Sequence, residues 1–264
     1  MLALTVAASL AATGQPVAQP ACKPAALGEA TVQTLIDSHT IRLTDGRDVR
    51  LAGVEVPHRD TGTATQAART ALETSLAGRR VSLWRFGAGQ DRYGRIVALV
   101  AVEPRNLGGP VEIAQTVQGS LLAQGLARVA AKTGDAACAS ELLAAEQNAR
   151  TAGLGLWADP YYVIVRAEDP ARILLARGHF AVIEGTVLSV RESGGTIYVN
   201  FGRRWSDDFT VTVPKRNERA FTAAGLNLKA LARRSVRVRG TVEERGGPWI
   251  EATRPEQIEI AERQ

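Results

Sequence analysis

The sequence has few cysteines and no long apolar run. Its 264 residues include two cysteines, Cys22 and Cys138, and neither has a second cysteine at CxxC spacing, so metal binding by thiolates is not indicated. No apolar run approaches the roughly 20 residues that a membrane-spanning helix needs. Hydrophobic residues make up 45% of the chain and charged residues 22%, an ordinary balance for globular domains. We therefore expect a folded protein with no membrane span.

The N-terminus is typical of a secretory signal peptide. An apolar run at residues 2–12 is followed by small residues and prolines, although no Lys or Arg precedes the run. We predict a signal peptide within residues 1–21 and an exported, periplasmic or secreted protein; the alternative is a disordered Ala-rich arm. Export would place Cys22 and Cys138 in an oxidising compartment where they can pair, and two unpaired thiols are the alternative.

The positive charge is concentrated at one end of the chain. Residues 170–264 hold 16 Lys and Arg against 11 Asp and Glu, so this third carries the whole formal charge of +5. A basic domain favours polyanionic partners such as nucleic acid or an anionic membrane surface. The alternative is a solvated charged face without a partner.

Two parts of the chain show the same predicted order of three strands, a helix and two strands. The first has strands expected at 31–36, 40–43, 48–54, 80–86 and 95–102, a helix at 65–76, and later helices at 113–124 and 136–151. The second has strands expected at 180–191, 196–201, 208–213, 235–243 and 249–252, and a helix at 216–224. This is the order of an OB-type barrel. The predicted fold class is mainly β with α (α+β): a five-stranded barrel domain with C-terminal helices at 29–158, a linker at 159–177 and a second OB-like barrel domain at 178–264.

Short motifs follow one another along the first part. They are IDSHT at 36–40, VRLAGVEVPH at 49–58, DRYGR at 91–95, QGLARV at 124–129 and GLGLW at 153–157. In this order and spacing they resemble the motifs of the staphylococcal nuclease (thermonuclease) family. The resemblance implies the thermonuclease fold from about Glu29 to Trp157, and hydrolysis of phosphodiesters in DNA and RNA with a bound Ca²⁺.

The resemblance also assigns roles to two arginines. Arg50 and Arg95 match the residues that would hold the scissile phosphate and stabilise the charge that builds in the transition state. Arginine suits this role because its planar fork binds two phosphate oxygens at once and stays protonated. The alternatives are a strand-surface salt bridge for Arg50 and a turn residue for Arg95.

The acidic positions of the family motifs are largely replaced. Asp37 matches the first carboxylate, but His39 stands at the second, Glu55 at the third and His58 at the position of the general base. Since Ca²⁺ takes hard oxygen ligands, three interpretations stay open. In the first, the domain no longer cuts, and it binds nucleic acid or another partner. In the second, His39, His58 and Glu55 hold a transition metal instead. In the third, His58 is a general base without the usual metal. Drifted surface residues are the remaining alternative.

The second part offers a less specific pattern. Aromatic residues beside Arg203 and Arg204 could stack on bases and bind phosphates, as OB-folds do with single strands. Phe201 and Phe209 are expected in the core because of their alternation, which leaves Tyr198 and Trp205 as the exposed candidates.

The sequence is compatible with two functions. The leading one is phosphodiester hydrolysis of nucleic acid, or residual nucleic-acid binding, at an altered active site. The alternative is a catalytically inactive envelope protein that uses both barrels for contacts with protein partners. Steep salt dependence of nucleic-acid binding would favour the first class, because neutralised phosphates release counterions.

Overall fold

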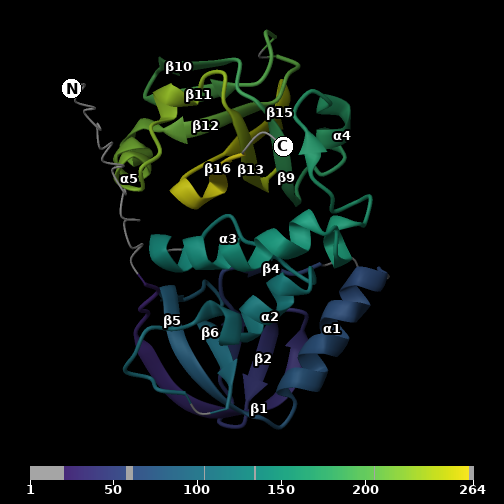
Figure 1. Cartoon of the computed structure of the whole chain (residues 1–264), viewed down its shortest axis with the longest axis vertical. Coiled ribbons are helices and arrows are strands. Elements are labelled where there is room, and N and C mark those ends of the chain that lie inside the picture. The colour runs from purple at the N-terminus through teal and green to yellow at the C-terminus, as the bar shows by residue number, and fades with distance from the viewer. Residues whose placement is uncertain (1–20, 58–61, 104, 134, 205, 262–264) are drawn as a thin grey trace, which may run out of the picture.

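The computed structural model describes residues 21–57, 62–103, 105–133, 135–204 and 206–261. These residues form a lower and an upper unit with helix α3 between them (Figure 1). Their buried hydrophobic side chains form two large clusters, one drawn from Cys22 to Leu142 and the other from Val165 to Ile258. No helix in the described part of the chain is both long and apolar enough to cross a membrane.

The first unit is a closed five-stranded barrel with strand order β1-β2-β3-β6-β5. Its strands are β1 (Ala26–Asp37), β2 (Thr40–Leu43), β3 (Asp48–Leu51), β5 (Arg80–Gln90) and β6 (Ile96–Val102). A two-stranded sheet stands beside it, made of β4 (Val54–Glu55) and β7 (Arg128–Val129). The predicted barrel with a helix between its third and fourth strands is therefore confirmed.

Helices cover the barrel where apolar residues recur at helical spacing. The α1 helix (Thr63–Leu76) buries Ala68, Leu72 and Leu76, and α3 (Ala136–Thr151) begins at Asp135, whose side chain accepts a hydrogen bond from the Cys138 N–H. The helix expected at 113–124 is instead divided into η1 (Ile113–Gln115) and α2 (Val117–Ala123). Thr116 causes the division, because its backbone is extended and its hydroxyl caps α2 by accepting from the Gly119 N–H.

Gly125 and Gly155 allow the end of α2 to lie against the short helix η2 (Gly155–Trp157). Gly125 has φ +69°, and a Cβ built on it would lie 2.3 Å from the Leu154 carbonyl oxygen. The Gly125 carbonyl accepts a hydrogen bond of 2.8 Å from the Leu156 N–H. Only glycine permits both this backbone conformation and this approach.

Cys22 and Cys138 form a disulfide bond across 116 residues of sequence. The pairing, one of the two alternatives left by the sequence, is thus present in the structure. Cys22 is also held by its backbone, since its N–H donates to Glu141 and its carbonyl accepts from the Val111 N–H, both at 2.9 Å. The start of the described chain is therefore fixed to α3.

The second unit consists of two sheets, with orders β10-β11-β12-β15-β14 and β16-β13-β9-β8. Its strands are β8 (Val165–Arg166), β9 (Phe180–Thr186), β10 (Ser189–Ser193), β11 (Thr196–Asn200), β12 (Thr210–Pro214), β13 (Ser235–Thr241), β14 (Glu243–Arg245), β15 (Gly247–Glu251) and β16 (Ile258–Ile260). Its helices are α4 (Pro170–Leu174), η3 (Lys215–Asn217), α5 (Glu218–Ala223), η4 (Leu228–Leu231) and η5 (Pro255–Gln257). The segment expected to be a linker contains β8, which pairs with β9, and α4, which is capped by Asp169.

A second closed barrel is not confirmed among the described residues. The strand pairings β10-β11-β12-β15 repeat the senses of β1-β2-β3-β6, including the parallel third pair. Closure would need the free edge of β15 to pair with another strand of the unit, but β14 forms a hairpin with β15 along that edge. The expected strand at 180–191 is likewise broken into β9 and β10. The unit is a β domain whose five-stranded sheet keeps one open face.

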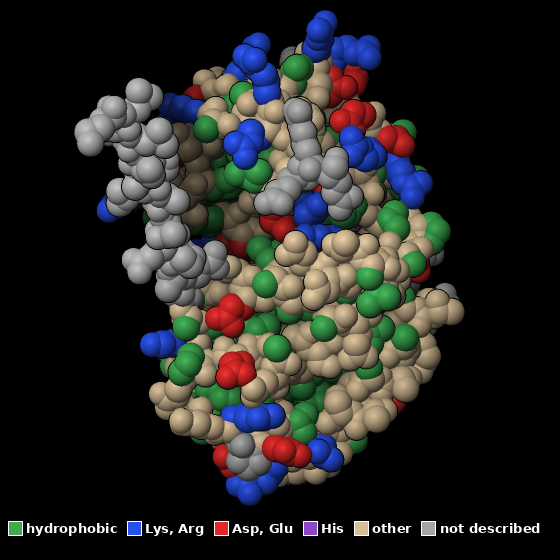
Figure 2. All heavy atoms as spheres, in the orientation of Figure 1, with side chains coloured by type: hydrophobic (Ala, Val, Ile, Leu, Met, Phe, Trp, Pro, Cys, Tyr) green, Lys and Arg blue, Asp and Glu red, His purple; other side chains and the backbone are tan. Residues whose placement is uncertain are grey.

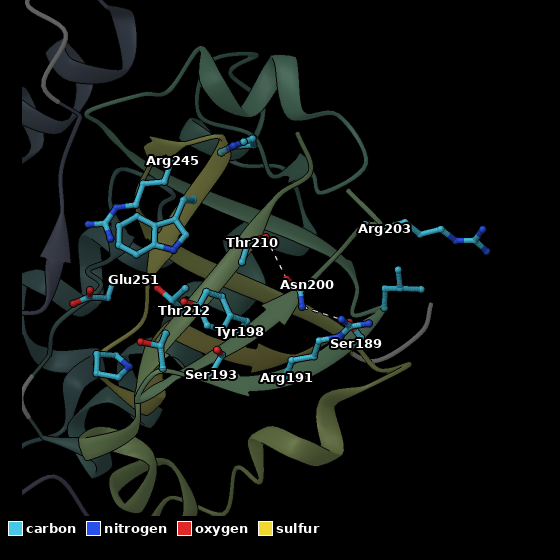
Figure 3. Close-up of a pocket in the computed structure, with 17 residues that line it drawn as sticks. Ser189, Arg191, Ser193, Tyr198, Asn200, Arg203, Thr210, Thr212, Arg245 and Glu251 are labelled. Carbon is cyan, nitrogen blue, oxygen red and sulfur yellow. Dashed lines mark hydrogen bonds between the residues drawn. The ribbon is translucent and has the colours of Figure 1, made fainter. Parts of the chain in front are cut away.

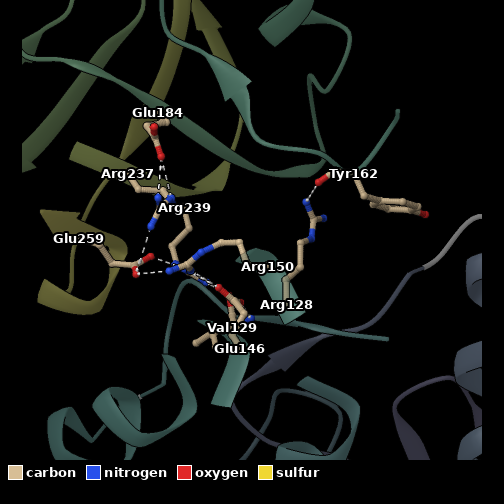
Figure 4. Close-up of polar contacts among 9 residues, drawn as sticks. All are labelled: Arg128, Val129, Glu146, Arg150, Tyr162, Glu184, Arg237, Arg239 and Glu259. Atoms are coloured by element: carbon tan, nitrogen blue, oxygen red, sulfur yellow. Dashed lines mark hydrogen bonds and ion pairs between the residues drawn. The ribbon is translucent and has the colours of Figure 1, made fainter. Parts of the chain in front are cut away.

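The two units share a buried ion network (Figure 4). Arg239 on β13 and Glu146 on α3 are both fully buried, and the guanidinium donates two hydrogen bonds of 3.1 and 3.0 Å to the carboxylate. Arg239 also binds Glu259 and the Val129 carbonyl, while Arg150 donates to Glu146 at 2.7 Å. Burial works to lower the pKa of Arg239, but the carboxylates of Glu146 and Glu259 more than offset it and raise that pKa. Arg239 of the second unit thus binds Glu146 and Val129 of the first unit and Glu259 of its own unit, so the buried charges join the two units.

Arg128 on β7 makes a second buried contact between the units (Figure 4). Its guanidinium donates to the carbonyls of Tyr162 at 3.3 Å and Phe180 at 3.2 Å, and it lies over both aromatic rings. Burial lowers the pKa of Arg128 to about 10, against the opposite influence of Glu55 and Glu146. The guanidinium is still charged at neutral pH, and it holds the second unit over the β4–β7 sheet.

Lys and Arg side chains gather over the second unit on the face shown in Figure 2, as the sequence count predicts.

Candidate nucleic-acid site at the barrel rim

Arg50 points away from the barrel core at the middle of β3. Its neighbours across the sheet are Thr40 on β2 and Val97 on β6, whereas the adjacent pair Ile41 and Val49 is fully buried inside the barrel. Side chains opposite one another on neighbouring strands share a face, and successive residues alternate. Arg50 and Thr40 therefore share the outer face. Arg50 forms no hydrogen bond or ion pair with any residue that the structure describes.

Arg95 reaches the same face from the turn that precedes β6. Its Nη1 donates to the Thr40 hydroxyl at 3.0 Å and its Nε donates to Asp91 at 2.7 Å. Asp91 also accepts the backbone N–H groups of Tyr93 and Arg95, and Gly94 takes the left-handed conformation that closes the turn. Burial would raise the pKa of Asp91, but these hydrogen bonds hold it below its usual value. The turn thus fixes one guanidinium in place and neutralises it.

His39 lies between these groups in the turn after β1. The Asp37 carboxylate accepts its backbone N–H at 2.8 Å and lies 3.5 Å from its Nδ1. Burial lowers the pKa of His39; Asp37 and Glu55 act to raise it, and Arg50 and Arg95 act to lower it. The imidazole is therefore neutral at neutral pH, and the charges of all four residues act on it. Asp37, Glu55, Arg50 and Arg95 thus all lie within electrostatic reach of His39.

The segment that follows β4 comes to the same turn. The Ser38 hydroxyl donates to the Pro57 carbonyl at 3.4 Å, which joins the end of β1 to the end of the second motif. His58, the expected general base, lies outside the described residues, so its predicted role stays a prediction.

The candidate metal ligands do not fit Ca²⁺. One of the three described candidates is an imidazole, which is a poor ligand for a hard cation, and the Asp37 carboxylate already accepts the His39 N–H in its turn. Glu55 lies on β4 opposite Arg128, whose positive charge it supports. Within the described part of the chain, no group of three or more His, Cys, Asp or Glu side chains is placed to hold a metal ion.

A cavity of about 510 Å³ opens beside Arg50 and Glu55. Arg95 does not line it, so the two arginines share a face but not this cavity. The far wall comes from the second unit, in Gly178, His179, Phe180 and Thr241, and Lys132 adds a further cation. Sequence reasoning missed this wall, because nothing local links residues around 179 to the strand that carries Arg50.

The candidates in the second unit are only partly brought together. Tyr198 is exposed on β11, and Arg203 lines the same groove (Figure 3). Arg204 lies outside that lining and faces Asp207 at 3.9 Å, and Trp205 lies outside the described residues. Phe209 is fully buried with its ring 4.9 Å from that of Phe201, which confirms the expectation that both belong to the core.

Residues 48–159 match the family model described as staphylococcal nuclease homologue. The matched region begins at β3 and ends after η2, so it contains Arg50, Glu55 and Arg95 but not Asp37 or His39. The closed barrel supplies those two residues through β1 and β2. No match was found among curated proteins.

Proposed function

Residues 48–159 belong to the staphylococcal nuclease homologue family, and from this premise we propose that the domain binds the phosphodiester backbone of nucleic acid at the barrel face that carries Arg50 and Arg95. One observation carries the proposal. Arg95 is fixed by Asp91 and Thr40, while Arg50 on the same face has no counter-ion among the described residues. A phosphate would find one positioned guanidinium and one with uncompensated charge, and charge-assisted hydrogen bonds to phosphate are among the strong ones.

We propose further that this binding is accompanied by little Ca²⁺-dependent hydrolysis. The residues at the acidic positions support this, since His39 is an imidazole and Glu55 lies opposite Arg128. A general-base role for His58 and a transition-metal site remain proposals, which a panel of divalent metals separates. Robust Ca²⁺-stimulated cleavage that a chelator abolishes would contradict the proposed binding role.

We propose that the protein acts outside the cytoplasm. The disulfide between Cys22 and Cys138 supports this, because such bonds persist in oxidising compartments. An exported nucleic-acid-binding protein would meet nucleic acid released into its surroundings.

The affinity of a labelled oligonucleotide, measured by fluorescence anisotropy, tests the arginine face. We expect Arg50→Ala to weaken binding about tenfold, since a hydrogen bond to a charged group contributes about 1.5–3 kcal/mol. Arg79→Ala is the control, because it removes the same charge from an exposed position where Arg79 already pairs with Glu103 at 3.3 Å and is not among the candidate site residues. Equal affinities of both variants and the unmodified protein, with flat salt dependence, would favour the alternative of an envelope protein that contacts proteins.

A further inference from the structure

The outer face of the five-stranded sheet carries a groove that is separate from the barrel rim (Figure 3). Its volume is about 860 Å³. We call it the sheet groove and define it by Arg191, Tyr198, Asn200, Thr210, Thr212 and Trp249, which line it. None of these residues belongs to the family-matched region.

Strand alternation explains why polar and aromatic side chains share this face. On β11, Ile197 and Val199 are buried in the core while Tyr198 between them is exposed. On β12, Val211 and Val213 belong to the core, so Thr210 and Thr212 face the other way. Side chains of the inner face pack in the hydrophobic core, and side chains of the outer face line the groove.

Strand register arranges the outer side chains in two rows across the sheet. The first row runs from Arg191 through Tyr198 and Thr212 to Glu251. The second row runs from Ser189 through Asn200 and Thr210 to Trp249. Each row therefore places an aromatic ring among hydrogen-bonding groups.

Among the charged side chains that line the groove, arginines outnumber carboxylates. Arg191 and Arg203 form no ion pair with any residue in the described ranges. Arg245 lies over the Trp249 ring at 3.6 Å and has an exposed carboxylate, Glu243, at 3.5 Å. Glu251 is the one carboxylate among the lining residues that the structure describes. Glu243 offsets Arg245, so Arg191 and Arg203 stand against Glu251, and this balance favours an anionic ligand.

One buried polar atom in the groove lacks a partner. Thr212 is 5% exposed and lines the groove, and its hydroxyl oxygen has no hydrogen-bond partner in the described structure. An unsatisfied buried hydroxyl carries a free-energy cost. A ligand with a donor or acceptor above Tyr198 and Thr212 would satisfy it.

We propose that the sheet groove binds single-stranded nucleic acid, with a base stacked on Tyr198 and the backbone phosphates held by Arg191 and Arg203. The proposal rests on the proposed function for its ligand class. Stacking on an aromatic side chain combined with arginine contacts to the backbone is how a single strand is bound without sequence preference. A duplex is disfavoured, because its bases are stacked on one another and cannot stack on Tyr198. A neutral glycan could also use the aromatic rings, but it would leave the unpaired guanidiniums unused.

The experiment compares variants of the full chain with a labelled single strand, in chelator so that the strand stays intact. Tyr198→Ala should weaken binding about tenfold or more, whereas Tyr198→Phe should retain it because the ring remains. The double variant Arg191→Ala/Arg203→Ala should lower the slope of log affinity against log salt by about 1.4. Arg219→Ala, an exposed arginine of α5 outside the groove lining, is the matched control and should change affinity little.

The outcomes separate the groove from the barrel rim. If Arg50→Ala weakens binding and Tyr198→Ala does not, the groove proposal is wrong and the proposed function stands. If Tyr198→Ala weakens binding and Arg50→Ala does not, the groove is supported and the proposed function of the barrel face is contradicted. Tighter binding of duplex than of single strand, a loss with Arg219→Ala as large as with the groove variants, or binding of a neutral oligosaccharide without a single strand would each overturn the groove proposal. Thermal unfolding of each variant checks that the fold is intact.

Discussion

The two β units pair their first strands in the same senses, but they differ in where their charged side chains lie. The closed barrel has its charged candidates at the rim, where Asp91 neutralises Arg95, while Arg50 has no counter-ion among the described residues. The second unit presents the outer face of its five-stranded sheet, where Arg191 and Arg203, which form no ion pair within the described ranges, lie beside aromatic rings. The difference shows that one order of strands can place its charged side chains either around the rim of a barrel or along the outer face of a sheet.

Reduction of the disulfide should have the largest effect on stability, and it should act on the first unit because both cysteines belong to the core of that unit. The bond closes a loop with a sequence separation of 116. Loop entropy predicts a contribution of about 5 kcal/mol to the free energy of unfolding. We expect dithiothreitol to lower the urea midpoint of the protein strongly. The double variant Cys22→Ser/Cys138→Ser should start at the lower midpoint and not respond, and an unchanged midpoint for the unmodified protein would contradict the prediction.

Breaking the ion network should have the next largest effect on the free energy of unfolding, because the network is buried and joins the two units. Glu146→Ala removes the central carboxylate and leaves Arg239 with fewer partners. Removing one partner of a buried pair costs about 3–5 kcal/mol. The matched control is Glu244→Ala, which breaks the exposed pair with Arg177 and should cost at most about 1 kcal/mol. Urea denaturation measures both, and similar losses for the two variants would show that the network does not stabilise the interface.

The smallest expected effect is the pH response of His39 in the first unit. Burial lowers the folded-state pKa of His39 below its ordinary value of 6.5. The unfolded chain therefore binds this proton first as the pH falls, and the free energy of unfolding decreases below about pH 6.5 until the folded-state pKa is reached. We expect His39→Gln to lose less stability than the unmodified protein between pH 7.5 and pH 5. The other histidines are present in both proteins and cancel in this comparison, so a larger pH-dependent loss in the variant would contradict the prediction.

Local sequence signals predicted the elements of the first unit well. The alternation of strands and the DRYGR turn each act within a few residues, and the structure agrees with them. The differences from expectation also have identifiable places. Thr116 divides an expected helix by capping its second part, and β14 pairs with β15 at the edge where a second barrel would close.

The sites were harder to predict, because their residues meet through long-range pairing. Arg191 and Trp249 were not singled out in the sequence, yet strand register places them on one sheet face with Tyr198. Glu146 and Arg239 are 93 residues apart, and neither position alone indicates a buried partner. The wall that His179 and Phe180 add to the cavity beside Arg50 depends on how the two units pack.

The position of Arg239, 93 residues after Glu146, has a consequence for how the chain folds during synthesis. Glu146 leaves the ribosome 93 residues before its main counter-ion, a delay of several seconds at about 5–20 residues per second. During that interval the partners that the described part of the first unit offers this carboxylate are the Val129 N–H and Arg150. The barrel and its helices can assemble first, but the upper side of α3 then carries a charge that water must solvate. Synthesis of β13 then supplies Arg239, so the last part of the chain completes the hydrogen bonds of a carboxylate in the first unit.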